Sequence, residues 1–218
     1  MSTHSAYSPS EELANSLTHL VGAGLAVTAL VLMILTSVEQ SDPWRLASSL
    51  VYGISLIVLF LSSTLYHAFP WPGIKQKFKL LDHCAIYLLI AGSYTPFLLI
   101  SLRGWLGWTL FGLVWGLALI GLALKLGYGN RFKAVRVGSY ILMGWLVLFA
   151  CVPLAEAIGW GGMSWLVAGG LSYSFGVFFY LNKKMKFSHS IWHLFVLAGS
   201  ICHFFSIWCH VLPNDGVL

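Results

Sequence analysis

Seven long apolar stretches, almost free of charged residues, constrain the fold of this chain more than any other feature. They cover residues 17–37, 46–69, 80–101, 105–125, 137–156, 164–182 and 189–212. Each is close to the ~20 residues with which a helix crosses the hydrocarbon core of a bilayer. A backbone in lipid must satisfy its own hydrogen bonds, and stretches of this length do so as helices. The sequence therefore predicts an all-α membrane protein with seven transmembrane helices.

Composition and segment lengths leave little room for any other domain. Of the 218 residues, 58% are hydrophobic and 9% are charged, whereas a soluble domain carries about 25% charged residues. We expect a cytosolic tail over residues 1–16, one transmembrane domain over 17–212 and an external tail over 213–218. The first stretch has no basic segment before it and no small-residue cleavage site after it. This pattern predicts a retained helix and not a cleaved signal peptide.

The basic residues predict the orientation of the chain. Arg45 and Arg103 stand apart, while ten of the 12 lysines and arginines lie in the second, fourth and sixth loops: Lys75, Lys77, Lys79, Lys125, Arg131, Lys133, Arg136, Lys183, Lys184 and Lys186. Basic loops stay in the cytoplasm, so we expect a cytoplasmic N-terminus and an external C-terminus in the inner or plasma membrane. Because the net charge of +5 comes from loops beside lipid, it predicts contact with anionic lipid and no nucleic-acid partner.

Ionisable residues occur at the cytoplasmic ends of three of these stretches. His67 ends the second stretch, Asp82 begins the third, and His189 and His193 begin the seventh. The two histidines of the seventh stretch are four residues apart, which places them on one helix face about 6 Å apart. Three imidazoles suffice for a zinc ion that keeps one coordination position open. The shared depth therefore predicts that His67, His189 and His193 bind Zn²⁺.

Asp82 and Ser63 are the candidate catalytic residues beside this site. Asp82 is placed to accept a proton from a water molecule at the site or from a histidine ligand. Ser63 precedes His67 by four residues, so we expect its hydroxyl to face the same cavity and to donate to a substrate carbonyl or to the metal-bound water. A carboxylate inside a membrane costs a few kcal/mol unless it is paired or faces water. An ion pair between Asp82 and Lys79 is the alternative explanation for it.

The remaining histidines have simpler explanations. His83 lies about 100° around the helix from Asp82, and His210 lies near the expected outer end. His203 follows His193 by ten residues, about 15 Å deeper in the membrane, where it lines a cavity or is a hydrogen-bonded core residue. His19 opens the first stretch. Even the His189–His193 pair has an alternative, because histidines near an interface also face lipid headgroups.

In this order, the polar residues resemble the haemolysin III branch of the progestin and adipoQ receptor family. The resemblance covers residues 11–212 and is carried by Glu11-Glu12-Leu13-Ala14-Asn15 with His19, Ser63-x-x-x-His67, Leu81-Asp82, and His189-x-x-x-His193 with His203 beyond. It implies seven spans, a cytosolic N-terminus and a zinc ion held by the three histidines, with Asp82 and Ser63 in the same polar centre. It also implies kinship with alkaline ceramidases, and a role of bacterial members in membrane lipid or energy homeostasis.

Three functions are compatible with these features. The first is a zinc-dependent intramembrane hydrolase in which a membrane lipid, as an amide or ester, is the substrate. The second is a membrane sensor or regulator without enzymatic activity, in which zinc is structural and joins the second and seventh spans. The third is an ion or proton transporter or channel, because intramembrane His and Asp also mark proton paths. The one-sided position of the polar residues favours the first two.

Overall fold

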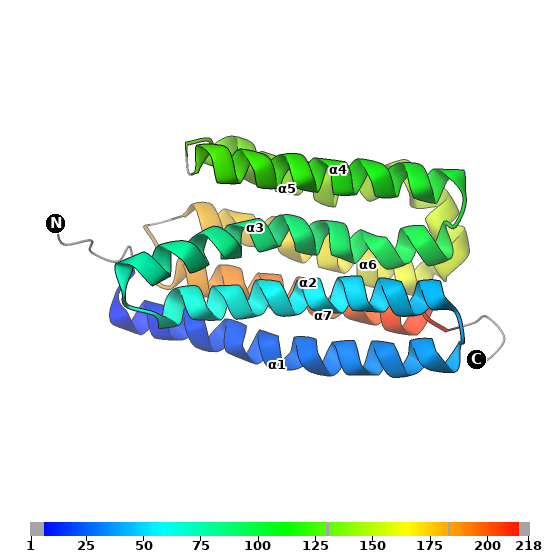
Figure 1. The fold of residues 1–218 in the computed structure, drawn as a ribbon, viewed down its shortest axis with the longest axis horizontal. Coiled ribbons are helices and arrows are strands. Elements are labelled where there is room, and N and C mark those ends of the chain that lie inside the picture. The colour runs from blue at the N-terminus through cyan, green and yellow to red at the C-terminus, as the bar shows by residue number, and fades with distance from the viewer. Residues whose placement is uncertain (1–6, 130, 183, 214–218) are drawn as a thin grey trace.

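A computed structural model describes residues 7–129, 131–182 and 184–213. Within these ranges the regular structure is helical, and the long helices lie side by side along one axis (Figure 1). They are α1 (Pro9–Glu39), α2 (Pro43–Ala68), α3 (Pro72–Pro96), α4 (Trp105–Tyr128), α5 (Lys133–Gly144), α6 (Cys151–Leu181) and α7 (Ser188–His210). A π-helix, η1 (Phe97–Ser101), follows α3, and a 3₁₀-helix, η2 (Leu146–Ala150), joins α5 to α6.

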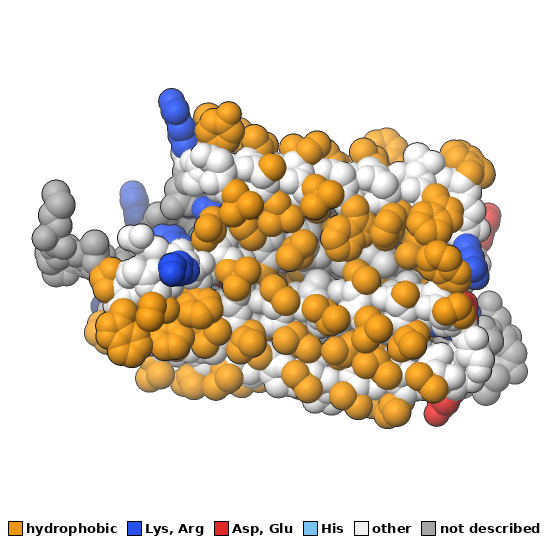
Figure 2. Space-filling view, in the orientation of Figure 1, with side chains coloured by type: hydrophobic (Ala, Val, Ile, Leu, Met, Phe, Trp, Pro, Cys, Tyr) orange, Lys and Arg blue, Asp and Glu red, His pale blue; other side chains and the backbone are white. Residues whose placement is uncertain are grey.

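The surface of the bundle is that of a membrane protein. Six helical segments of the described chain are long and apolar enough to cross a bilayer, and one of them, Lys133–Leu181, combines α5, η2 and α6. Large apolar side chains such as Val31, Leu119 and Phe175 are exposed on the flanks, which Figure 2 shows covered with hydrophobic groups. Most lysine and arginine side chains in that view lie at the end where α1, α3 and α7 begin. The prediction of a helical, multi-pass membrane protein is therefore confirmed at this level.

The first helix begins at Pro9, whereas the sequence led us to expect a tail up to residue 16. A capping box explains the early start: the Ser8 N–H donates to Glu11 Oε2 at 2.9 Å, and the Glu11 N–H donates to Ser8 Oγ at 3.4 Å. Proline fits the first turn of a helix because its missing N–H has no partner there. The extra turns carry Glu12 and Asn15 to the candidate site. Of the expected external tail over 213–218, all but Pro213 lies outside the described residues.

The fifth and sixth apolar stretches form one helical segment with two interruptions. The first is η2, where the Tyr94 hydroxyl donates to the Gly144 carbonyl at 2.8 Å and accepts from the Val147 N–H at 2.9 Å. This side chain satisfies backbone groups that a regular helix would have paired, as lipid requires. The second is Gly159, whose φ of 66° breaks the helix in a conformation that suits glycine. A short turn at Leu102–Gly104 joins η1 to α4.

Glycines allow α1 and α3 to pack closely on either side of α2. A Cβ atom on Gly22 of α1 would lie 2.5 Å from the Phe60 ring, and one on Gly92 of α3 would collide with Ser55. This close packing fixes the position of the last turns of α2, which carry Ser63 and His67, between the first turns of α1 and α3.

Candidate metal centre

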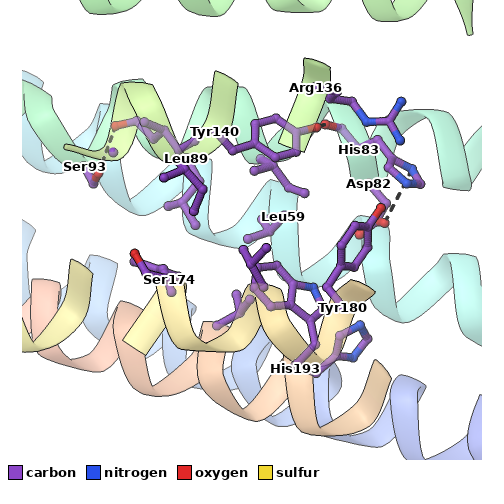
Figure 3. A pocket seen from close by; sticks show the side chains of 18 of the residues that line it. Leu59, Asp82, His83, Leu89, Ser93, Arg136, Tyr140, Ser174, Tyr180 and His193 are labelled. Carbon is purple, nitrogen blue, oxygen red and sulfur yellow. Dashed lines mark hydrogen bonds and ion pairs between the residues drawn. The ribbon is translucent and has the colours of Figure 1, made fainter. Parts of the chain in front are cut away.

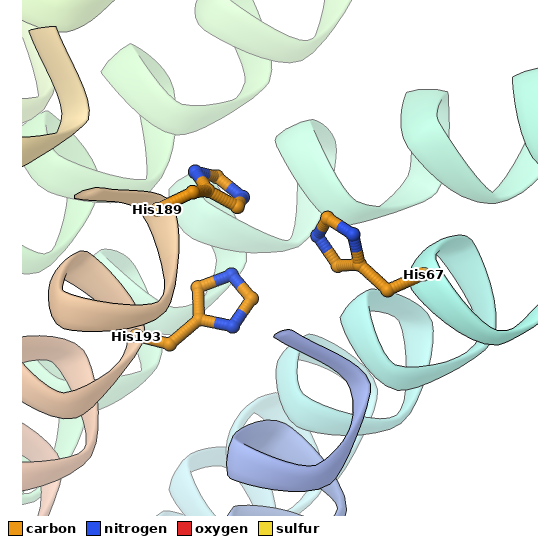
Figure 4. A group of neighbouring side chains, drawn as sticks. All are labelled: His67, His189 and His193. Carbon is orange, nitrogen blue, oxygen red and sulfur yellow. The ribbon is translucent and has the colours of Figure 1, made fainter. Parts of the chain in front are cut away.

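Three histidines converge at the end of the bundle where α7 begins. His67 comes from the end of α2, and His189 and His193 come from the first two turns of α7 (Figure 4). One nitrogen from each ring lies within 4.8 Å of the others, and within the described residues this is the group of His, Cys, Asp and Glu side chains with the spacing of a metal site. The structure therefore brings together the three residues that the sequence pointed to.

The first turns of α1 determine which ring nitrogen of His67 faces the cluster. Glu12 Oε2 lies 2.6 Å from His67 Nδ1, and Glu12 Oε1 lies 3.0 Å from Lys75 Nζ. A carboxylate only accepts hydrogen bonds, so Nδ1 carries the proton and Nε2 keeps its lone pair. That Nε2 atom is buried without a hydrogen-bond partner among the described residues. An available, dehydrated lone pair of this kind is what a metal ligand needs.

His193 is held in the same way by the backbone of α1. Its Nδ1 lies 3.1 Å from the carbonyl oxygen of Asn15, which accepts the hydrogen bond, and 3.2 Å from Thr18 Oγ1. The Asn15 side chain in turn accepts a hydrogen bond from Ser190 Oγ at 2.6 Å. These contacts tie α1 to α7 and leave Nε2 of His193 for the cluster.

His189 is enclosed by an aromatic side chain from the segment before α1. The Tyr7 ring stacks on it with centroids 5.0 Å apart and planes inclined by 21°. Burial raises the pKa of the Tyr7 phenol, which therefore stays neutral at physiological pH. His189 Nε2 is also buried without a hydrogen-bond partner in the described chain. With an unpartnered nitrogen on His67 and another on His189, the residues present fit a metal ion.

Asp82 lies beside this group without belonging to it. The group with metal-site spacing contains the three histidines alone. The Asp82 oxygens therefore do not lie within 4.8 Å of all three histidine nitrogens. Figure 3 shows Asp82 facing the same space as His193 and Tyr180. Its Oδ2 is 3.9 Å from Nδ1 of His83, so the neighbouring histidine is closer to the carboxylate than its position around the helix suggested. Lys79 and Lys125 add positive charge around the carboxylate.

Ser63 is placed differently from our expectation. Its side chain is fully buried, it does not border the cavity, and its hydroxyl has no partner within hydrogen-bond distance among the described residues. It interacts with Asp82 at longer range. The hydroxyl therefore lies on the side of α2 that faces Asp82 of α3.

A cavity of about 330 Å³ extends from the cluster into the bundle. Asp82, His189 and His193 border one end of it, and His203 borders it farther along α7. Most of the wall between them is apolar; it includes Leu59, Ile86, Leu89, Ile90, Val177 and Val196. Such a space suits an acyl chain more than a polar solute.

The structure also assigns positions to the other histidines. His19 stacks on His193 with ring centroids 3.5 Å apart, although it is not part of the group with metal-site spacing. His83 donates from Nδ1 to the Lys79 carbonyl at 2.5 Å. His210 packs against Gly161 and Gly162 at the opposite end of the bundle.

Sequence reasoning named Glu12, Asn15 and His19 but assigned them no role at the histidine cluster. Glu12, Asn15 and His19 are spaced by three and four residues, so they share one face of α1. A stripe of polar side chains on an otherwise apolar helix is a readable signal, but it becomes visible only once the helix is known to begin at Pro9. Tyr7, which lies before that helix, carries no comparable sequence signal.

A bundle of long apolar helices with a histidine cluster at one end defines a class of protein: a polytopic membrane protein with a candidate metal centre. Comparison with known proteins identifies the family. A family described as "Haemolysin-III related" matches residues 7–204. The chain is 47% identical over 204 residues to "Hemolysin-3" of Bacillus cereus, an alignment that covers 94% of this chain and 93% of that protein.

Two further relatives extend this similarity. The "Hemolysin-3 homolog" of Bacillus subtilis (strain 168) is 43% identical over 205 residues, covering 93% of this chain and 96% of that protein. The "Monocyte to macrophage differentiation factor" of Homo sapiens is 31% identical over 215 residues, covering 94% and 87%. The chain therefore belongs to the haemolysin III-related family, a branch of the progestin and adipoQ receptor family, and the resemblance carried by its motifs is confirmed.

Proposed function

We propose that this protein is a zinc-dependent hydrolase of the membrane, acting on an amide or ester bond of a lipid. One observation carries the proposal: three histidine nitrogens lie within 4.8 Å of one another, and two of these histidines, His189 and His193, border a largely apolar cavity together with a carboxylate that is outside the group. A structural metal site is closed by a fourth protein ligand, whereas a catalytic one keeps an open position.

His67, His189 and His193 would hold the metal, and a zinc ion at this position supplies Lewis acidity that polarises a carbonyl and lowers the pKa of water toward about 7. Asp82 borders the cavity and acts as the base that accepts the proton of the attacking water. Ser63 is a positioning residue, because it adjoins Asp82 and not the cavity. The apolar wall holds the acyl chain and excludes bulk water. In the cell, this activity would serve membrane lipid or energy homeostasis.

We further propose seven membrane crossings, with the N-terminus in the cytoplasm and the C-terminus outside, in the plasma membrane. The Lys133–Leu181 segment has 49 residues, which as a straight helix would span about 74 Å, more than twice the thickness of the hydrocarbon core. The bend at Gly159 divides it into two crossings. An odd number of crossings also accounts for α1 beginning and α7 ending at opposite ends of the bundle (Figure 1). The concentration of basic residues at the end with the histidine cluster supports a cytoplasmic location for that end.

The test of the metal proposal is zinc content. We expect about one zinc ion per chain in protein purified in detergent, and a sharp loss when His67, His189 or His193 is replaced by alanine. His210→Ala is the matched control, because His210 lies at the opposite end of the bundle. Wild-type zinc content in the triple variant, measured by elemental analysis, would refute the proposed ligands.

The test of the enzymatic proposal is Asp82→Asn. Asparagine is nearly isosteric but cannot accept a proton, so the variant should keep its zinc and melting temperature while losing hydrolysis of ceramide-like or phospholipid substrates. The alternative function, a sensor with structural zinc, is favoured by the way in which the site links α1, α2 and α7. In that case Asp82 closes the coordination shell, and Asp82→Asn lowers zinc content and melting temperature together.

A further inference from the structure

His203 is a polar residue of the cavity wall to which the proposed chemistry gives no role. It lies on α7 ten residues after His193, about 15 Å along the helix axis. Its side chain is 9% exposed and borders the same cavity as Asp82 and His193. Neither ring nitrogen has a hydrogen-bond partner among the described residues. The backbone of Leu166 interacts with the ring, but outside normal hydrogen-bond geometry.

Other polar groups around this part of the cavity are already satisfied within the protein. Ser93 donates to the Ile90 carbonyl at 2.9 Å, the Trp145 indole donates to Ser174 Oγ at 3.0 Å, and the Tyr173 hydroxyl is bonded to Ser200 Oγ at 2.9 Å. Figure 3 shows Ser93 and Ser174 at the end of the cavity away from Asp82. His203 is therefore exceptional at this depth, because a buried polar group without a partner costs about 1–3 kcal/mol.

The packing around His203 holds its ring in place. Gly169 of α6 lies so close that a Cβ atom there would collide with the ring, and Tyr173 contacts it edge-on with centroids 5.3 Å apart. The imidazole is thus fixed at a defined distance from the histidine cluster. A neutral imidazole offers one donor and one acceptor, which matches a hydroxyl group.

We propose that His203 forms a second polar subsite of the cavity, which binds a hydroxyl substituent on the acyl chain of the lipid. The inference deepens the proposed function and rests on it, because the carbonyl end of the lipid is taken to lie at the histidine cluster. An extended chain advances about 3.5 Å for every three bonds, so 15 Å corresponds to about thirteen bonds from the carbonyl carbon. The substituent is therefore expected at about carbons 12 to 14 of the acyl chain.

The experiment measures equilibrium binding of fatty acids, the products of the proposed reaction, to the full protein in detergent. The probes are stearate and its 2-, 12- and 18-hydroxy derivatives, each competing with radiolabelled stearate. One net hydrogen bond corresponds to about fivefold in affinity, so 12-hydroxystearate should bind about fivefold more tightly than stearate. The 2- and 18-hydroxy acids should show no such gain. Equal binding of all four acids, or binding of none, would overturn the proposal.

Variants locate the effect at His203. In His203→Leu the preference for 12-hydroxystearate over stearate should fall to about onefold, with stearate binding retained, whereas His203→Gln keeps a donor and an acceptor and should retain part of the preference. A preference that persists in His203→Leu would also overturn the proposal. The positional series on the wild-type protein remains decisive if a variant does not fold. Zinc content measured on the same preparation reports separately on the proposed function: a zinc-loaded protein without the preference refutes the His203 subsite alone.

Discussion

Glu12 offers the sharpest test of how the candidate metal centre is built. Its carboxylate lies 2.6 Å from Nδ1 of His67, whose side chain is completely buried, and it also contacts Lys75 at 3.0 Å. We expect Glu12→Gln to weaken zinc binding without removing any ligand. A hydrogen bond to a charged group contributes about 1.5–3 kcal/mol and a neutral one about 0.5–1.5 kcal/mol. The substitution therefore costs about 1–1.5 kcal/mol, which is about tenfold in Kd.

The size of this effect depends on the tautomer of His67. With glutamate, the charge fixes the proton on Nδ1 and makes Nε2 a stronger ligand. A glutamine side chain can either accept from Nδ1 or donate to it, so part of the population would turn the wrong tautomer toward the cluster. Glu12→Ala leaves Nδ1 without this partner, and we expect a larger loss, toward the hundredfold upper range for such supporting residues.

The assay is competition for zinc between the purified protein and a chromophoric chelator of known affinity. Glu11→Gln is the matched control, because Glu11 caps α1 at Ser8 and accepts from the Phe187 N–H at 3.0 Å without touching a histidine. Lys75→Gln removes the ion pair of Lys75 with Glu12 and keeps the contact of Glu12 with His67. Its Kd for zinc therefore separates the two contributions. An unchanged Kd in Glu12→Gln, or an equal loss in Glu11→Gln, would refute the reasoning.

Two further predictions concern topology and packing. A reporter enzyme that works only outside the cytoplasm should be active when it is fused to the C-terminus. Activity of a reporter that works only inside the cytoplasm would contradict seven crossings with a cytoplasmic N-terminus. Gly22→Ala forces a methyl group against Phe60, whereas Gly24→Ala meets nothing within 4 Å. Both substitutions gain the same helix propensity, so the difference between them reports the contact with Phe60. The free energy of unfolding of Gly22→Ala, measured by denaturation, should be about 1–3 kcal/mol lower than that of Gly24→Ala. Equal values would contradict the close approach of α1 and α2.

The sequence was sufficient to predict the three-histidine cluster because few variables determine it. Segment length gives the helices, their alternation sets which ends meet, and the spacing of His189 and His193 places both on one face. Those quantities are local and do not depend on side-chain packing. His67 follows from the same alternation, since the end of the second span and the start of the seventh lie at the same end of the bundle.

Other features depend on how helices rotate against each other, and the sequence predicted them poorly. Ser63 shares a helix face with His67 in a helical projection, yet its hydroxyl interacts with Asp82 of α3 and does not border the cavity. Gly159, where the helix breaks, is one of many glycines in the chain. Nothing in its local sequence distinguishes it from Gly22, which is buried inside α1. The start of α1 is different, because Ser8 and Glu11 form a recognisable capping box that apolar periodicity alone does not detect.

The packing at the end of the bundle opposite the histidine cluster helps to choose between hydrolysis and transport. A transport path would continue as a chain of polar groups to the other end of the bundle. There, however, Leu154, Ile207 and Leu212 are almost completely buried in one apolar cluster. The Ser206 hydroxyl is used in a 2.8 Å bond to the Gly162 carbonyl, and Arg45 bonds to the carbonyls of Val211 and Pro213 at 2.7 and 3.1 Å. Among the described residues, this apolar packing favours the proposed hydrolase over a transport path.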